Sequence, residues 1–124
     1  MQDLPTPAAI VDLVIAQMGE APLAERSKFE TRVMAAALQL VSRALKLGPA
    51  SDARELQRLR ALLGADGDLE TLNLRLCEHI RDSAVTLDTP GLAAHLRATT
   101  LEKLAIDQPS YAAYRRALED EGRT

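Results

Sequence analysis

Apolar residues recur every three or four positions along most of the chain, and the clearest case is the segment from Phe29 to Leu47. This spacing places side chains on one face of an α-helix. One apolar strip consists of positions 29, 33, 36, 37, 40, 41, 44 and 47, and a second consists of Met34, Leu38 and Leu45. Because so wide an apolar surface needs covering on most sides, we predict that this helix lies at the centre of a bundle.

Capping residues and prolines predict where the first two helices begin and end. Thr6 followed by Pro7 is a strong helix start, since threonine caps free amides and proline is tolerated in the first turn. Gly19 is a plausible end for this helix. The central helix is expected to begin near Ser27 and to end at Gly48–Pro49, where proline blocks continuation.

The remaining helices follow from the same signals. Ser51 or Asp52 is expected to cap a third helix, and the turn 66–68 a fourth, in which Cys77 flanks the apolar stripe. Thr89–Pro90 predicts the start of a fifth helix, which Pro109 ends.

No segment alternates between apolar and polar residues as a strand would, so the predicted fold class is all-α. The short connections favour a single-domain bundle of about five antiparallel helices over residues 1–109. Residues 110–124 are charged and terminal, and we expect either a short sixth helix, capped by Ser110, or a frayed tail.

Composition narrows the function classes. The chain has 124 residues, 47% of them hydrophobic, which suits one globular domain, and its formal charge of -3 argues against nucleic acid as a partner. A single cysteine and a start without a basic segment and apolar core indicate a cytoplasmic protein. The apolar runs are far too short for a membrane span.

The residues with reactive side chains do not form a recognisable catalytic motif. His79 and His95 are on different predicted helices without a second ligand one turn away, so we expect ordinary surface or half-buried histidines and no metal site. Cys77 is expected to be a small core residue rather than a nucleophile. Without a glycine-rich phosphate loop either, no cofactor is predicted and an enzyme is the less favoured reading.

Several charged residues interrupt apolar regions of the second and fifth predicted helices. They are Arg32, Arg43, Arg97, Glu102, Lys103 and Asp107. Structural ion pairs or surface groups are the default interpretation of such charges. The alternative is an anion or partner site, with Arg32, Arg97 and Lys103 converging between the two helices.

Three segments together resemble a bacterial family of uncharacterised domains, DUF6285: QDLPTPAAIVDLV, FETRVMAAALQLVSRALKLGPA and HLRATTLEKLAIDQP. The resemblance covers roughly residues 2–109. Its main matches are Phe29, Arg32, Val33, Leu38, Arg43, Leu45, Gly48, Pro49, Leu96, Arg97, Leu101, Lys103, Leu104, Ile106, Asp107 and Pro109. The family commonly has His, Asn and Glu where this chain has Glu30, Ala36 and Ala44.

The resemblance implies an accessory role, because members are often encoded beside a phosphotransferase similar to aminoglycoside kinases and beside acyl-CoA dehydrogenases. We therefore expect a small interaction domain that docks onto such a partner protein in acyl-CoA metabolism. Tyr111 and Tyr114 are the candidate aromatic contacts of its terminal segment. The alternative is a small-molecule protein that binds an anion, and a homodimer is compatible with either reading.

Overall fold

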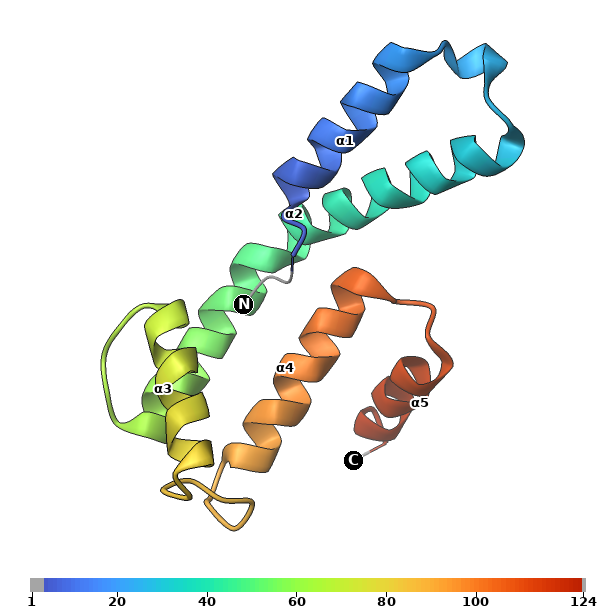
Figure 1. Cartoon of the computed structure of the whole chain (residues 1–124). Coiled ribbons are helices and arrows are strands. Elements are labelled where there is room, and N and C mark those ends of the chain that lie inside the picture. The colour runs from blue at the N-terminus through green and yellow to red at the C-terminus, as the bar shows by residue number, and fades with distance from the viewer. Residues whose placement is uncertain (1–3, 124) are drawn as a thin grey trace. The chain divides into compact units, whose positions relative to one another are not determined.

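A computed structural model describes residues 4–123, and every regular element in that range is helical. The elements are α1 (Pro7–Glu20), the short 3-10 helix η1 (Leu23–Glu25), α2 (Lys28–Leu63), α3 (Leu69–Arg81), α4 (Leu92–Asp107) and α5 (Ala112–Glu121) (Figure 1). The predicted all-α fold class is confirmed. The terminal segment 110–124 contains the helix α5, and a short helix is one of the two alternatives predicted for it.

Three predicted helix starts are confirmed by their capping bonds. The Thr6 hydroxyl accepts a hydrogen bond from the amide of Ala9 at 3.2 Å, and Asp68 Oδ1 accepts one from the amide of Thr71 at 2.7 Å. Ser27 and Glu30 form a reciprocal capping box at the start of α2, since each side chain accepts a bond from the other residue's amide, at 3.1 and 2.8 Å. These bonds satisfy amides that have no partner inside the helix.

The expected break at Gly48–Pro49 is wrong, because α2 continues through Pro49 for a total of 36 residues. Proline inside a helix removes one backbone hydrogen bond and crowds the preceding turn, but packing of the following residues offsets that cost. The expected cap at Ser51 or Asp52 is wrong for the same reason. Ser51 is instead a buried residue within α2.

Two later caps also differ from the prediction. The Thr89 hydroxyl accepts a bond from the Thr86 amide inside the preceding loop, and α4 begins after Gly91, whose φ is +91°. Tyr111, not Ser110, occupies the N-cap position of α5 and makes no capping side-chain bond there. In the first case the Thr89 side chain bonds within the loop instead of capping the helix that follows.

The chain forms two compact units, and the boundary falls inside α2 between Gly48 and Pro49. In the N-terminal unit, α1 and the first part of α2 run in opposite directions and are joined through η1 (Figure 1). The expected division into a helical bundle domain over residues 1–109 and a charged C-terminal helix or tail over 110–124 stays a prediction.

Burial in the N-terminal unit contradicts the predicted central position of segment 29–47. Val14 in α1 and Val41 and Ala44 in α2 are buried there. Phe29, at 70% exposure, is largely open to solvent, and Val33, Leu38, Leu45 and Leu47 are exposed as well. The apolar pattern correctly predicts a helix here, but it does not predict how many neighbours cover it.

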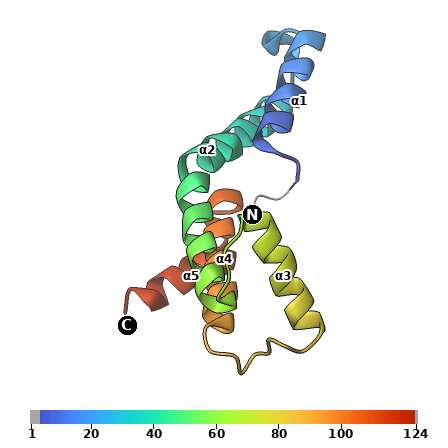
Figure 2. The same ribbon diagram turned by 90° about the vertical axis from the view of Figure 1, so that its left-hand side faces the viewer.

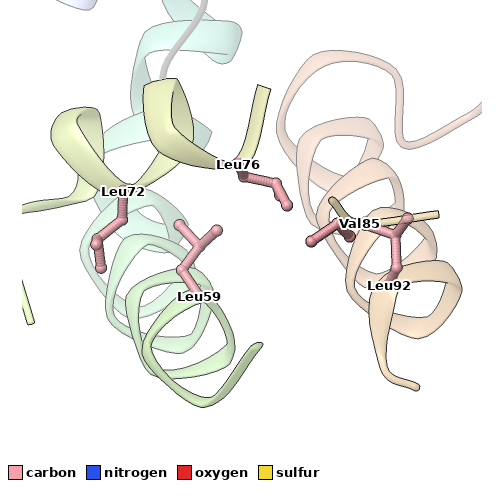
Figure 3. Packing of buried hydrophobic residues seen from close by; sticks show 5 residues of the cluster. All are labelled: Leu59, Leu72, Leu76, Val85 and Leu92. Carbon is pink, nitrogen blue, oxygen red and sulfur yellow. The ribbon is translucent and has the colours of Figure 1, made fainter. Parts of the chain in front are cut away.

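The hydrophobic core lies in the C-terminal unit. It consists of Leu59 from α2, Leu72 and Leu76 from α3, Val85 from the following loop and Leu92 from α4 (Figure 3). Both α3 and α4 lie beside the Pro49–Leu63 part of α2 (Figure 2). Cys77 was expected in this core but is exposed, because it lies about 100° around α3 from buried Leu76.

Candidate functional site

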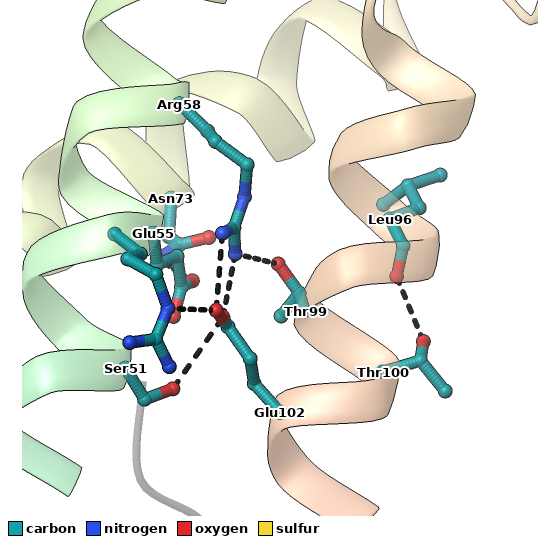
Figure 4. A network of polar contacts seen from close by, with 9 residues as sticks. Ser51, Glu55, Arg58, Asn73, Leu96, Thr99, Thr100 and Glu102 are labelled. Carbon is teal, nitrogen blue, oxygen red and sulfur yellow. Dashed lines mark hydrogen bonds and ion pairs between the residues drawn. The ribbon is translucent and has the colours of Figure 1, made fainter. Parts of the chain in front are cut away.

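A polar cluster joins the later part of α2 to α3 and α4 (Figure 4). On α2 its members are spaced by three or four residues, which places them on one side of the helix. The polar cluster consists of Ser51, Arg54, Glu55 and Arg58 from α2, Asn73 from α3, and His95, Thr99 and Glu102 from α4.

Glu102 is the centre of the hydrogen bonds between α2 and α4. Its Oε1 accepts bonds from Arg54 Nε at 2.6 Å and Arg58 Nη1 at 3.2 Å, and its Oε2 accepts one from Arg58 Nη2 at 2.7 Å. The Ser51 hydroxyl donates to Oε2 at 3.4 Å. Arg58 Nη2 also donates to the Thr99 hydroxyl at 3.2 Å. Earlier α2 residues therefore pair with later α4 residues, as antiparallel helices require.

Two further polar side chains are almost fully covered by protein. Glu55 Oε1 accepts a bond from Asn73 Nδ2 at 2.8 Å, which links α2 to α3. His95 is 3% exposed and its Nδ1 has no hydrogen-bond partner, which is also true of Arg58 Nε. The expectation of an ordinary surface or half-buried histidine is therefore wrong for His95. A buried polar atom without a partner is costly, so apolar packing around the cluster must offset that cost.

The environment of the cluster lowers the pKa values of His95 and Glu102. Burial lowers the pKa of His95 below its ordinary 6.5, and the positive charge of Arg58 lowers it further, although Glu55 and Glu102 act in the opposite direction. Burial by itself would raise the pKa of Glu102, but the hydrogen bonds from Arg58 and Arg54 outweigh it and hold the pKa below its ordinary 4.5. At neutral pH we therefore treat His95 as uncharged and Glu102 as a carboxylate.

Both arginines of the cluster, Arg54 and Arg58, pair with the same carboxylate, Glu102, while His95 is uncharged at neutral pH. We interpret the cluster as the ion-pair network that fixes the position of α4 against α2, and not as a binding site.

The other chemically distinctive region is an exposed apolar surface on the N-terminal unit. Its members all expose more than a third of their surface, and they are Leu13, Ile15, Met18, Leu23, Phe29, Val33, Leu38, Leu45 and Leu47. Exposed apolar residues are normal singly, but many on one small unit are typical of an interaction surface.

The exposed residues of α2 flank its buried ones on both sides. At about 100° per residue, Phe29, Val33 and Leu47 fall within about 40° of one another. Leu38 and Leu45 fall on the opposite flank, and the buried Val41 and Ala44 lie between the two groups. The apolar arc of α2 is thus about 180° wide, and only its middle is covered.

The predicted binding residues of α4 point in different directions. Arg97 Nε donates to Glu121 Oε1 of α5 at 3.2 Å, so it forms an ion pair within the C-terminal unit. Lys103 is half-buried and lies six residues further along, about 120° around the helix from Arg97. Asp107 is exposed as the last residue of α4.

The other predicted residues lie in separate places. Arg32 is exposed near the start of α2 and its Nε donates to the Lys28 carbonyl at 3.3 Å, while Arg43 is half-buried further along the same helix. Tyr111 is exposed and Tyr114 half-buried on α5. The convergence of Arg32, Arg97 and Lys103 on one anion, and docking through the tyrosines, stay predictions.

Sequence reasoning singled out Glu102 as a charge in an apolar region, but it interpreted His95 as an ordinary histidine and Ser51 as a cap, and it did not predict that the members of the polar cluster lie together. A signal was present, because Leu92, His95, Thr99 and Glu102 repeat at three and four residues and form one face of α4. The leucines dominate the apolar pattern of α4, yet Leu96 is exposed while His95 is buried. A search for apolar faces cannot detect a polar stripe on one helix that packs against a polar stripe on another.

One of the comparisons with known proteins identifies a family. Between residues 4 and 123, no helix is long and apolar enough to cross a bilayer, and no group of three potential metal ligands occurs. No match was found among curated proteins or among solved structures. The family described as "Domain of unknown function (DUF6285)" has a sequence profile that matches residues 21–111, which is most of the chain. The chain therefore belongs to the DUF6285 family.

Proposed function

We propose that the chain is a helical interaction domain that docks onto a partner protein through the exposed apolar surface of its N-terminal unit. The observation that carries this proposal is the exposure of large apolar side chains on both flanks of α2, with Phe29 the most open of them. Burying the open part of one such side chain stabilises a complex by about 1–2 kcal/mol. Several together are enough to support a specific interface.

The partner we propose is a phosphotransferase similar to aminoglycoside kinases, with an acyl-CoA dehydrogenase as the second candidate, in the cytoplasm. This choice rests on the family resemblance and on no contact seen in the chain. The chain would then act as an accessory subunit without turnover of its own. Its polar cluster supports such a role, because Arg54 and Arg58 already bond Glu102 within the domain and leave the exposed side chains to make contacts.

The test is a binding measurement between the purified chain and the purified phosphotransferase, by light scattering after size-exclusion chromatography. Two variants separate the candidate surfaces: Phe29→Ser with Val33→Ser, and Tyr111→Ala with Tyr114→Ala. Leu87→Ser is the matched control, because Leu87 is 79% exposed but lies in the loop between α3 and α4. We expect the first double variant to abolish the complex and the control to retain it.

Three other outcomes would count against this proposal. Loss of the complex only in the tyrosine variant would place docking on the terminal segment. The purified chain could be a dimer in the absence of any partner. If the Phe29→Ser/Val33→Ser double variant were then a monomer, a second copy of the chain would cover the surface. A monomer that binds neither enzyme would contradict the accessory role.

A further inference from the structure

A hollow of about 450 Å³ lies where the chain leaves η1 and enters α2. It is lined by Arg26, Lys28, Thr31 and Arg32, all of them in the N-terminal unit. Three of these four side chains carry a positive charge at neutral pH. The volume is within the range of sites that hold small molecules.

Arg26 is the most unusual of the lining residues. Its Nε and Nη2 atoms are covered by protein and have no hydrogen-bond partner. A guanidinium stays protonated at any physiological pH, so its donors cannot be relieved by losing the proton. The bonds that Arg26 lacks are those that an oxyanion in the hollow would supply once the guanidinium turns toward it.

The two cations of α2 lie on the same side of the helix, because Lys28 and Arg32 are four residues apart. The bond from Arg32 Nε to the Lys28 carbonyl fixes the guanidinium beside the hollow and does not use its two terminal nitrogens. The Thr31 hydroxyl donates to the Ser27 carbonyl at 3.1 Å, so its hydrogen is already engaged. The donors toward a ligand would therefore come from the three cations.

Two acidic residues lie at this turn: Glu25 directly precedes Arg26, and Glu30 is in the first turn of α2 with its carboxylate close enough for its charge to act on Arg26. The Glu30 Oε2 accepts a bond from the Ser27 amide at 2.8 Å, and bonding to Ser27 keeps the pKa of Glu30 below its ordinary value. Glu25 and Glu30 therefore offset two of the three positive charges, while the Glu30 carboxylate stays bonded at the helix start. The remaining positive charge favours a ligand group with two negative charges over one with a single charge.

We propose that the hollow between η1 and α2 binds the phosphate group of a small phosphorylated molecule, with Arg26, Lys28 and Arg32 as its cationic contacts. This function goes beyond protein docking and does not depend on it. The site also differs from the anion site expected from Arg32, Arg97 and Lys103, because all its residues lie within seven positions of one another. Guanidinium groups suit phosphate, since each can donate two parallel hydrogen bonds to its oxygens.

The test is calorimetric titration of the whole chain with inorganic phosphate at pH 7.5, with acetate at matched ionic strength as the comparison. We expect phosphate to bind at least about tenfold more tightly than acetate, and Arg26→Gln and Arg32→Gln each to weaken it about tenfold. Arg75→Gln is the control, because Arg75 is exposed on α3 outside the hollow. Equal binding of the two anions, or equal loss in the control, would overturn the proposal.

A second measurement uses the unaltered chain and guards against a variant that fails to fold. The Arg26 Nε–H signal in a ¹⁵N–¹H spectrum is expected to shift on titration with phosphate and to stay in place with acetate, because a new hydrogen bond changes the shielding of that proton. No movement of this signal at saturating phosphate would overturn the proposal, whatever the variants show.

Discussion

Arg58 and Glu102 form a two-point pair across α2 and α4: Nη1 donates to Oε1 at 3.2 Å and Nη2 donates to Oε2 at 2.7 Å. The two side chains are 24% and 16% exposed, so water screens them only in part. Parallel bonds between a planar guanidinium and a planar carboxylate fix orientation as well as distance. This pair therefore sets how α4 is positioned along α2, 44 residues away in sequence.

We predict that Glu102→Gln destabilises the chain by about 2 kcal/mol. Glutamine keeps the size of the side chain but offers one acceptor oxygen in place of two and no charge. Arg58 then stays partly buried without its counter-charge, and Arg54 loses its partner as well. The free energy of unfolding, measured by urea denaturation, checks the prediction.

Glu121→Gln is the matched control for that measurement, since it breaks an exposed ion pair that also involves α4. Arg97 and Glu121 are 56% and 49% exposed, and pairs so open to water contribute less than about 1 kcal/mol. If both variants lost the same stability, the burial of the Arg58–Glu102 pair would not matter, and our account of the polar cluster would be wrong.

Stability is predicted to fall with acidification from about pH 6.5 because of His95. Its folded-state pKa lies below its ordinary 6.5, so in that window the unfolded chain binds more protons than the folded one. The contribution of His95 is fully present above pH 6.5 and is lost as the pH falls toward the folded-state pKa. The measurement is the free energy of unfolding between pH 7.5 and pH 5, where His95→Gln should flatten the slope.

Proton NMR gives an independent check on the same residue. In a His79→Gln background, His95 is the remaining histidine of the chain, so its ring signal can be followed without overlap. We expect its midpoint below 6.5. A midpoint above 6.5 would mean that the Glu55 and Glu102 charges dominate over burial.

Glu102 also has a lowered pKa, so its contribution to the free energy of unfolding is lost in a separate window, below about pH 4.5.

Leu72→Ala is predicted to cost about 3 kcal/mol, because Leu72 is fully buried in the core of the C-terminal unit and its loss leaves a cavity. Leu74→Ala on the same helix is the control: Leu74 is 61% exposed, and its replacement should change stability by less than about 0.5 kcal/mol. Thermal or urea unfolding compares the two. A similar cost for both would show that α3 presents a different face to α2 and α4.

The features that sequence predicted correctly depend on neighbours within four residues. Thr6, Ser27 and Asp68 cap helices because each side chain reaches the amide three positions ahead, and that geometry is fixed by the local backbone. Pro49 was misread because its local preference against a helix interior is outweighed by the packing of the residues that follow it.

The features that sequence could not predict depend on contacts between distant elements. Phe29 is on an apolar face, but whether another helix covers that face is decided by the number and placement of the other helices. His95 is buried because the polar stripe of α4 meets Glu55 and Arg58 of α2, about 40 residues earlier in the chain. A pattern search on one helix cannot find a complementary pattern on another.

Gly19 and Gly64 offer a last prediction in which the same substitution has opposite effects. A Cβ at either position meets no atom within 4 Å, so neither alanine is excluded by crowding. Gly19 is inside α1, where alanine should stabilise by up to about 1 kcal/mol because it restricts the unfolded chain. Gly64 follows α2 with φ at +59°, a conformation that costs alanine about 1 kcal/mol.

The measurement is the free energy of unfolding of Gly19→Ala and Gly64→Ala, with Gly64→Asn as a third variant. Asparagine tolerates positive φ better than alanine, so it should recover part of the loss at position 64. This ordering isolates the backbone, because the three changes add side chains into open space. If Gly64→Ala were as stable as the unaltered chain, α2 would not end in a left-handed residue, and the turn to α3 would need a different geometry.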